Sequence, residues 1–290
     1  MDGARSPRDA SQPAPKETVD PIASVAVRQA VKPIDRTLST APPPRPDPSW
    51  GVFETLLAIQ GRPIELEAHL ARLDDSVRQV FGQAPPADAR ELVVEHASGI
   101  ALGRLRLTVA PNGADGLGAE AVTADVDPAL VFPAWDRAVA LRGVDVPGGL
   151  GAHKWADRRI VQQAESDPDG PVALIVDGDT VLEASRANVF AVHDRSLSTP
   201  PLDGRILPGV ARARAIEVAR AAGFEVRERQ LTLERLCQAD EVFLTGSVRG
   251  VEPVRAVAGA RTWTAGDVAP VIADGLRALW ASGSAALRLP

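Results

Sequence analysis

Three polar features follow one another in the second half of the chain. Glu183 comes first, Asn188 follows at the start of an expected strand, and a Leu207-Pro208-Gly209 turn then opens an expected helix. Proline and glycine at such a place are typical of a tight turn before a helix. The N–H groups of Val210 and Ala211 lie in the first helical turn, where free N–H groups suit a phosphate. A shielded carboxylate such as Glu183 suits a protonated ring nitrogen.

A lysine precedes these features. The chain has three lysines, and Lys16 and Lys32 lie in a proline-rich N-terminal region, which leaves Lys154. Desolvation lowers the pKa of a lysine, so that its amine can act as a nucleophile and as a base. An amine that bonds to an aldehyde, a carboxylate for a ring nitrogen and a phosphate cradle together indicate pyridoxal phosphate. The alternative is that Lys154 is an ordinary solvated loop lysine.

The order of several short segments resembles the fold-type IV (class IV) pyridoxal-phosphate enzymes. These segments include Gly51-Val-Phe-Glu-Thr55, His69-Leu-Ala-Arg72 and Thr245-Gly-Ser247, and the resemblance runs from about Gly51 to about Val257. It implies a two-domain α/β (α+β) fold like that of D-amino-acid aminotransferase. It also implies Lys154 as the catalytic residue. The implied cofactor-binding residues are Arg72, Lys154, Glu183, Asn188, Val210, Ala211 and Ser247.

The absence of tyrosine bears on which reaction of the family is expected. Branched-chain and D-amino-acid aminotransferases use tyrosines around the cofactor and substrate. The segment Lys154-x-x-Asp157-Arg158 resembles a Lys-x-x-Asn-Arg segment of aminodeoxychorismate lyases, and Thr55 stands where those lyases typically carry threonine. Arg159 stands where branched-chain enzymes carry tyrosine, and a guanidinium suits a substrate with two carboxylates. The resemblance thus implies Thr55 and Arg159 as substrate-binding residues.

The expected reaction is that of aminodeoxychorismate lyase, which converts 4-amino-4-deoxychorismate to p-aminobenzoate and pyruvate. One alternative is a class IV aminotransferase that acts on a branched-chain or D-amino acid. Another is a non-catalytic partner subunit of an aminodeoxychorismate synthase. For Arg158 and Arg159 the alternative is a solvated helix face. The segment Val109-Ala-Pro-Asn-Gly113 lacks an arginine that the family commonly has there.

Composition excludes several classes of protein. The 290 residues are 45% hydrophobic and 24% charged, which is typical of a globular protein. The net charge of −6 argues against a nucleic-acid partner. No apolar run reaches the length of a membrane span, and the N-terminus has no apolar signal core, so a cytoplasmic location is expected. One cysteine, Cys237, excludes a disulfide framework and is expected to be a half-buried helix residue. We expect no metal site.

The distribution of proline and glycine predicts three parts. The first is a disordered proline-rich tail or linker over residues 1–49. A small N-terminal α/β domain over 50–140 and a larger C-terminal cofactor-binding domain over 141–290 follow it. A short helix over 23–31 is also possible. A homodimer is expected from the resemblance, with Trp50, Trp135 and Trp155 as candidate interface residues. Hydrophobic periodicity predicts strands over 52–58, 104–110, 122–126, 138–146, 172–177, 180–182, 188–193, 225–229 and 241–245, and helices over 67–81, 87–98, 208–222 and 268–281.

Overall fold

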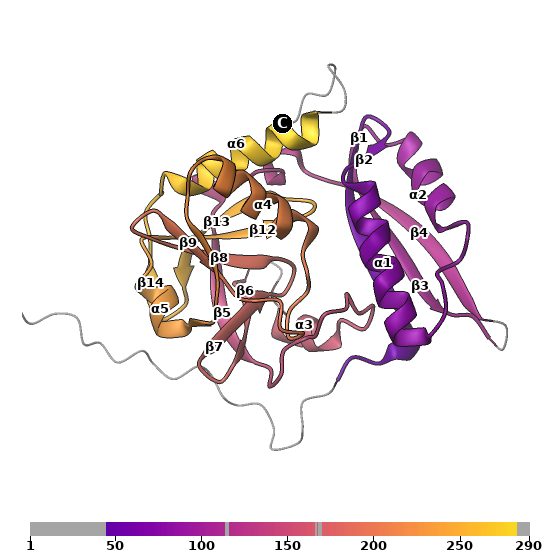
Figure 1. Cartoon of the computed structure of the whole chain (residues 1–290), viewed down its shortest axis with the longest axis horizontal. Coiled ribbons are helices and arrows are strands. Elements are labelled where there is room, and N and C mark those ends of the chain that lie inside the picture. Colours follow the sequence, from indigo (N-terminus) through magenta and orange to yellow (C-terminus); the bar gives the residue numbers. More distant parts are fainter. Residues whose placement is uncertain (1–44, 114–115, 166, 168–169, 283–290) are drawn as a thin grey trace, which may run out of the picture. The chain divides into compact units, whose positions relative to one another are not determined.

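The computed structural model describes residues 45–113, 116–165, 167 and 170–282, and it contains two β-sheets (Figure 1). One sheet has four strands in the order β2-β1-β3-β4. The other has ten strands, nine of them in the order β10-β9-β8-β12-β13-β5-β6-β7-β11, with β14 paired to β13. The mixed α/β class predicted from the sequence is confirmed. The predicted helix at 23–31 lies outside the described residues.

The four-stranded sheet carries helices on one face and leaves the other face to the functional site. It consists of β1 (Val52–Ile59), β2 (Arg62–Pro63), β3 (Leu102–Pro111) and β4 (Leu117–Asp125), with α1 (Leu66–Phe81) and α2 (Ala89–Ser98) packed against it. Successive strand residues point to opposite faces. Leu105, Leu107 and Val109 of β3 therefore pack under the two helices, whereas Arg104 and Arg106 line a cavity on the other side.

The ten-stranded sheet contains the remaining strands of the described chain. Its strands are β5 (Val139–Asp145), β6 (Val172–Asp177), β7 (Thr180–Ala184), β8 (Asn188–His193), β9 (Ser196–Thr199), β10 (Val226–Glu228), β11 (Leu231–Thr232), β12 (Glu241–Gly246), β13 (Gly250–Val257) and β14 (Arg261–Thr262). Its helices are α3 (Arg159–Ala164), α4 (Val210–Ala221), α5 (Leu233–Cys237) and α6 (Val268–Ala281), and short 3-10 turns occupy Pro48–Trp50, Pro128–Leu130 and Trp135–Arg137. Sheet membership thus changes between β4 and β5, although the domain division itself stays a prediction.

Alternation along β8 and β12 builds a separate core on each face of this sheet. Phe190 and Phe243 are fully buried and stack at 5.1 Å beneath α4 and α6. Their strand neighbours Val189, Val242 and Leu244 join the opposite core, which includes α5. Because α4 rests on the stacked rings, its N-terminal turn has a fixed place beside Asn188 at the start of β8.

Several short elements and one proline-containing strand account for the main differences from the predicted secondary structure. The sequence does not predict β9, β13 or α5. β13 is eight residues long but contains Pro253, and proline within a run argues against a strand, whereas β9 and α5 are too brief for a periodic pattern. Cys237 ends α5 and is half-buried, as predicted.

Part of the expected tail has a defined structure. The backbone N–H of Asp47 donates to Asp157 Oδ2 at 3.0 Å, and Asp47 Oδ1 accepts the N–H of Ser49 at 2.9 Å. Residues 45–49 are therefore held against the segment that follows Lys154. Trp50 is the exposed member of the three tryptophans considered for an interface, since Trp135 and Trp155 are half-buried.

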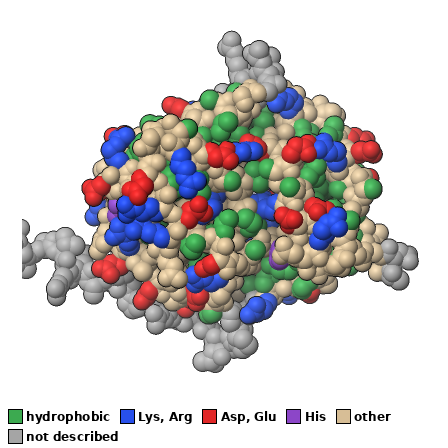
Figure 2. All heavy atoms as spheres, in the orientation of Figure 1, with side chains coloured by type: hydrophobic (Ala, Val, Ile, Leu, Met, Phe, Trp, Pro, Cys, Tyr) green, Lys and Arg blue, Asp and Glu red, His purple; other side chains and the backbone are tan. Residues whose placement is uncertain are grey.

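The described surface carries both signs of charge. On the face shown in Figure 2, arginine side chains lie interspersed with aspartates and glutamates. Within the described residues, no helix has the length and apolar character needed to cross a membrane.

Candidate active site

A cavity of about 570 Å³ brings the predicted site residues together. Strands β1, β3 and β4 supply one part of its wall. The loop around Lys154, the β7–β8 turn, the start of α4 and the β12–β13 turn supply the rest. The predicted residues that line the cavity are Thr55, Arg72, Lys154, Glu183, Asn188, Val210, Ala211 and Ser247. Arg159 is the predicted residue that does not line it.

Lys154 is held by backbone pairing with β1. Its carbonyl accepts the N–H of Phe53 at 2.8 Å, and the N–H of Ala156 donates to Gly51 at 2.9 Å. The Lys154 Nζ lies 4.8 Å from the centroid of the Phe53 ring. Burial, together with the nearby guanidiniums of Arg72 and Arg158, lowers the pKa of Lys154 to about 7. An amine with this pKa is partly neutral, and so nucleophilic, at neutral pH.

Glu183 is buried near the middle of the site. It lies in β7 opposite Ile175, and its Oε2 accepts the N–H of Leu207 at 3.2 Å. Burial raises the pKa of Glu183 to about 8, against the opposing effects of the Leu207 hydrogen bond and of Lys154. A protonated or cationic nitrogen placed beside this carboxyl would favour its ionised form.

Arg72 connects the small sheet to the loop before α4. Its Nε and one terminal nitrogen donate to the two oxygens of Glu54 at 2.8 and 2.6 Å, and the other terminal nitrogen donates to the carbonyl of Pro208 at 2.9 Å. Burial opposes the ionisation of Glu54, but Arg72 and His69 together outweigh it and lower the pKa of Glu54 to about 2. A guanidinium has five N–H donors, so two of those of Arg72 remain for a ligand in the cavity.

The turn before α4 is fixed by Asn188. The Asn188 amide donates to the carbonyl of Leu207 at 3.0 Å. A Cβ atom at Gly209 would lie 2.0 Å from Asn188 Oδ1, so the turn tolerates glycine alone. The N–H groups at the start of α4, including those of Val210 and Ala211, have no intrahelical acceptor because they belong to the first turn. They line the cavity beside Arg72.

Two hydroxyl groups on β12 and its following turn complete this part of the wall. Ser247 lines the cavity, as the sequence suggests. Thr245 lines it as well, and its buried Oγ1 has no hydrogen-bonding partner within the described residues. A buried hydroxyl without a partner is costly unless a ligand satisfies it. The Thr245-Gly-Ser247 segment points to Ser247, and Thr245 could have been recognised from its place two residues earlier on the same strand.

The two arginines after the lysine segment have different surroundings. Arg158 lines the cavity, is half-buried and donates to the carbonyl of Ser185. Arg159 is exposed and forms a salt bridge with Asp157 at 2.6 Å, while its guanidinium lies 5.0 Å from the Trp50 ring. Its guanidinium is thus occupied by Asp157, and Arg159 does not line the cavity. The substrate role given to Arg159 stays a prediction that this geometry does not favour.

Four further arginines line the cavity that sequence reasoning did not single out. They are Arg104, Arg106, Arg186 and Arg249. Because the predicted strand over 104–110 alternates as Arg104-Leu105-Arg106-Leu107, it places Arg104 and Arg106 on one face. Arg186 and Arg249 lie in turns, where no periodic pattern could reveal them. The guanidinium of Arg106 lies 3.8 Å from the Phe53 ring centroid, above the same ring as Lys154.

The low pKa of Lys154 predicts unusual reactivity in the protein without cofactor. Trace acetylation between pH 5 and 11, followed by peptide mass spectrometry, measures the fraction of each amine that is neutral. We expect labelling of Lys154 to reach half of its maximum near pH 7, whereas an unperturbed lysine does so near pH 10.4. Lys16 and Lys32 serve as internal references. A half-point for Lys154 above pH 10 would show that its amine is not desolvated.

Comparisons with known proteins agree with this geometry. The chain resembles the branched-chain-amino-acid aminotransferase of Escherichia coli K12, with 37% identity over 145 residues, 49% of this chain and 45% of that protein. A hypothetical aminotransferase from Mycobacterium tuberculosis, in its PLP-bound form, superposes with a TM-score of 0.71 at 26% identity, covering 85% of this chain and 96% of that one. The 4-amino-4-deoxychorismate lyase of Pseudomonas aeruginosa gives 0.66 at 28% identity, covering 79% and 90%.

A family model described as amino-transferase class IV matches residues 51–257. The matches to the curated relatives span less than half of those proteins' lengths. Class IV aminotransferases use pyridoxal phosphate, so the predicted cofactor is confirmed for the family. The predicted fold is confirmed as well, since the mixed α/β structure with its two sheets matches the class IV aminotransferase fold. The chain belongs to the class IV aminotransferase family and is an enzyme of that family.

Proposed function

We propose that the chain is an aminodeoxychorismate lyase, which releases pyruvate from 4-amino-4-deoxychorismate and leaves p-aminobenzoate. The supporting observation is the character of the cavity wall, where Lys154 and Glu183 lie among arginines that face the same space. A wall of this kind suits a substrate with two carboxylates better than a branched aliphatic side chain, because an unpaired buried guanidinium is costly. The chain also has no tyrosine to line such a pocket.

The residues of the cavity fit pyridoxal phosphate. In this proposal the phosphate takes the two remaining donors of Arg72, the N–H groups of Val210 and Ala211, and the hydroxyl of Ser247. Thr245 Oγ1, which has no other partner among the described residues, adds a further hydroxyl.

Glu183 and Asn188 have separate tasks in the proposal. Glu183 holds the proton on the ring nitrogen, and Asn188 fixes the turn before α4. When bound, the cofactor withdraws electrons from the carbon that bears the substrate's amino group.

Lys154 performs the proton transfers in this proposal. Its amine, with a pKa of about 7, takes the proton from the ring carbon next to the substrate nitrogen. The bond from the neighbouring carbon to the enolpyruvyl oxygen then breaks, and the released enolpyruvate takes up a proton and becomes pyruvate. Formation of an aromatic ring favours this step. Glu183 keeps the positive charge of the ring nitrogen in place throughout, since its carboxylate pairs with that charge in a buried setting.

Arg158 and Arg106 are the proposed ligands of one substrate carboxylate. Both line the cavity near Lys154, and burial lowers the pKa of each guanidinium. A bound anion would stabilise their charged forms. Thr55 lies beside them on β1 and offers a hydroxyl.

An aminotransferase is the second candidate. The identity of 37% with the E. coli branched-chain enzyme favours it. The two candidates share the proposed roles of Lys154, Glu183 and Arg72, so they differ in the substrate and not in the cofactor site. A homodimer, a synthase partner and a cytoplasmic location are part of the proposal and rest on the sequence alone.

Product analysis separates the two candidates. The protein loaded with pyridoxal phosphate is given 4-amino-4-deoxychorismate, and we expect pyruvate and p-aminobenzoate in equal amounts. Lys154→Ala should lower the rate by about a hundredfold or more, because the acid–base step is lost. Absence of pyruvate, together with amino exchange between 2-oxoglutarate and a branched-chain or D-amino acid, would replace the lyase with the aminotransferase.

Arg158 and Arg159 form a matched pair for locating the substrate. Arg158→Met should lose about 2–4 kcal/mol of transition-state binding, seen in kcat/KM, because it removes a charge-assisted contact in a shielded site. Arg159→Met removes the same charge one residue away and should change kcat/KM less than about threefold. Should Arg159→Met lose as much as Arg158→Met, the substrate role first expected for Arg159 would stand.

Gly209→Ala tests the proposed phosphate cradle. The added Cβ collides with Asn188 Oδ1, so the turn has to move away from the phosphate. We expect the affinity for pyridoxal phosphate, measured by absorbance titration, to fall at least about tenfold. A loss of this size corresponds to one lost charge-assisted contact. Gly99→Ala is the control, because a Cβ at Gly99 would have no heavy atom within 4 Å. Equal affinity of the two variants would place the phosphate elsewhere.

A further inference from the structure

A buried glutamate joins two arginines at the β12–β13 end of the cavity. Glu252 of β13 is 2% exposed. Its carboxylate accepts hydrogen bonds from Arg186 at 3.0 and 3.2 Å and from Arg249 at 2.9 Å. All three residues line the cavity, yet none of them takes part in the lysine and phosphate sites described above.

The charges of this cluster do not cancel. Two guanidiniums share one carboxylate, which leaves an excess positive charge on the cavity wall. The nearby Asp127 has its own partner in Arg137, at 3.7 Å. Burial lowers the pKa of Arg249, and the neighbouring Arg186 lowers it further. Each guanidinium uses one of its nitrogens for Glu252, so several N–H donors of both remain for an anion.

Tight turns fix the positions of the two arginines. The carbonyl of Arg249 accepts the N–H of Phe132 at 3.0 Å. The next residue, Gly250, has φ +63° and lies so close to Phe132 that a Cβ would be 2.2 Å from a ring carbon. Arg186 lies in the β7–β8 turn, which the Ala184 N–H closes by donating to Ala187 at 2.8 Å. Neither backbone has to move to receive a ligand, and such preorganisation favours binding.

We propose that Arg186 and Arg249, positioned by Glu252, form a second carboxylate subsite that makes the enzyme selective for dicarboxylate substrates. It would hold the carboxylate that Arg106 and Arg158 do not. Paired guanidiniums on a buried carboxylate offer the fork geometry that carboxylates accept. The identity of the natural ligand rests on the proposed lyase function, whereas the subsite itself rests on the cluster.

Binding of unreactive acids tests the subsite without turnover. The pyridoxal-phosphate-loaded protein is titrated by calorimetry with benzoate, isophthalate, terephthalate and glutarate. We expect at least one dicarboxylate to bind the parent about tenfold or more tighter than benzoate, as one added charge-assisted contact would give. Arg249→Met and, independently, Arg186→Met should abolish this preference and leave benzoate affinity within about twofold.

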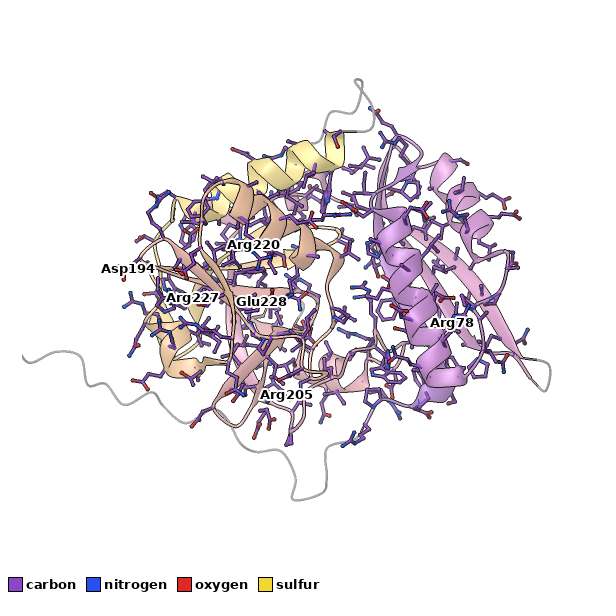
Figure 3. All side chains as sticks on the ribbon, in the orientation of Figure 1. Arg78, Asp194, Arg205, Arg220, Arg227 and Glu228 are labelled. Atoms are coloured by element: carbon purple, nitrogen blue, oxygen red, sulfur yellow. The ribbon has the colours of Figure 1, made fainter. Side chains whose placement is uncertain are left out.

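Arg227→Met is the matched control. Arg227 (Figure 3) lies on β10, pairs with Glu225 at 2.6 Å and does not line the cavity, so its loss changes net charge equally without touching the subsite. Arg249→Lys is a further variant that keeps the positive charge. Arg249 is chosen because it is the more buried of the pair. Arg249→Lys should retain part of the preference. Unchanged cofactor absorbance confirms that each variant is folded.

Lack of a dicarboxylate preference in the parent would overturn the subsite, and so would a preference that survives both methionine variants. A loss of benzoate binding equal to that of the dicarboxylate would also overturn it, since it would indicate general damage. Failure of the lyase reaction is seen in the pyruvate assay and not in this titration. A dicarboxylate preference without pyruvate release would therefore retain the subsite and reject the lyase.

Discussion

The fork of hydrogen bonds from Arg72 is the contact on which the site depends. One guanidinium binds both oxygens of Glu54 on β1 and the carbonyl of Pro208 before α4. Glu54 is buried, so its charge is tolerable only while Arg72 and His69 remain paired with it. Because Pro208 precedes the first turn of α4, the same side chain that neutralises Glu54 also sets the distance between the small sheet and the proposed phosphate cradle. A second link, from Glu65 to Arg214 of α4, supports it.

Burial acts in opposite directions on the two groups at the centre of the cavity. It lowers the pKa of Lys154 to about 7 and raises that of Glu183 to about 8, because in each case the neutral form is the cheaper one to bury. Both groups are therefore prepared for a partner that changes their charge. In the proposed function, the lysine bonds covalently to an aldehyde, and the glutamate pairs with a protonated ring nitrogen. Such opposed shifts in one cavity are typical of functional sites.

The sequence predicts which residues meet in the cavity better for the proposed cofactor site than for the proposed substrate site. Lys154, Glu183, Asn188 and the Pro208-Gly209 turn are recognisable because each meets a fixed requirement of charge or backbone geometry, and the structure brings them to one cavity. Arg186 and Arg249 come from turns whose neighbours in space are Glu252 and Phe132.

The contacts Arg186–Glu252 and Arg249–Phe132 are tertiary, and the local Arg249–Glu252 pair spans a turn, so none of them leaves a periodic trace in the sequence. For Arg159, the sequence suggests a role that the contacts in the structure do not favour. Its position along the chain suggests the substrate, but Asp157, two residues earlier, captures its guanidinium. The alternation of charged and apolar residues in β3 did carry the information needed to place Arg106, because a strand has only two faces.

Covalent trapping of the cofactor tests the central claim most directly. The protein is incubated with pyridoxal phosphate and reduced with borohydride, which fixes the cofactor to the amine that holds it, and the labelled peptide is identified by mass spectrometry. The account predicts a visible absorbance that disappears on reduction, with the label on Lys154 and no label on Lys16 or Lys32. A label on either of those two lysines, or on none of the three, would contradict it.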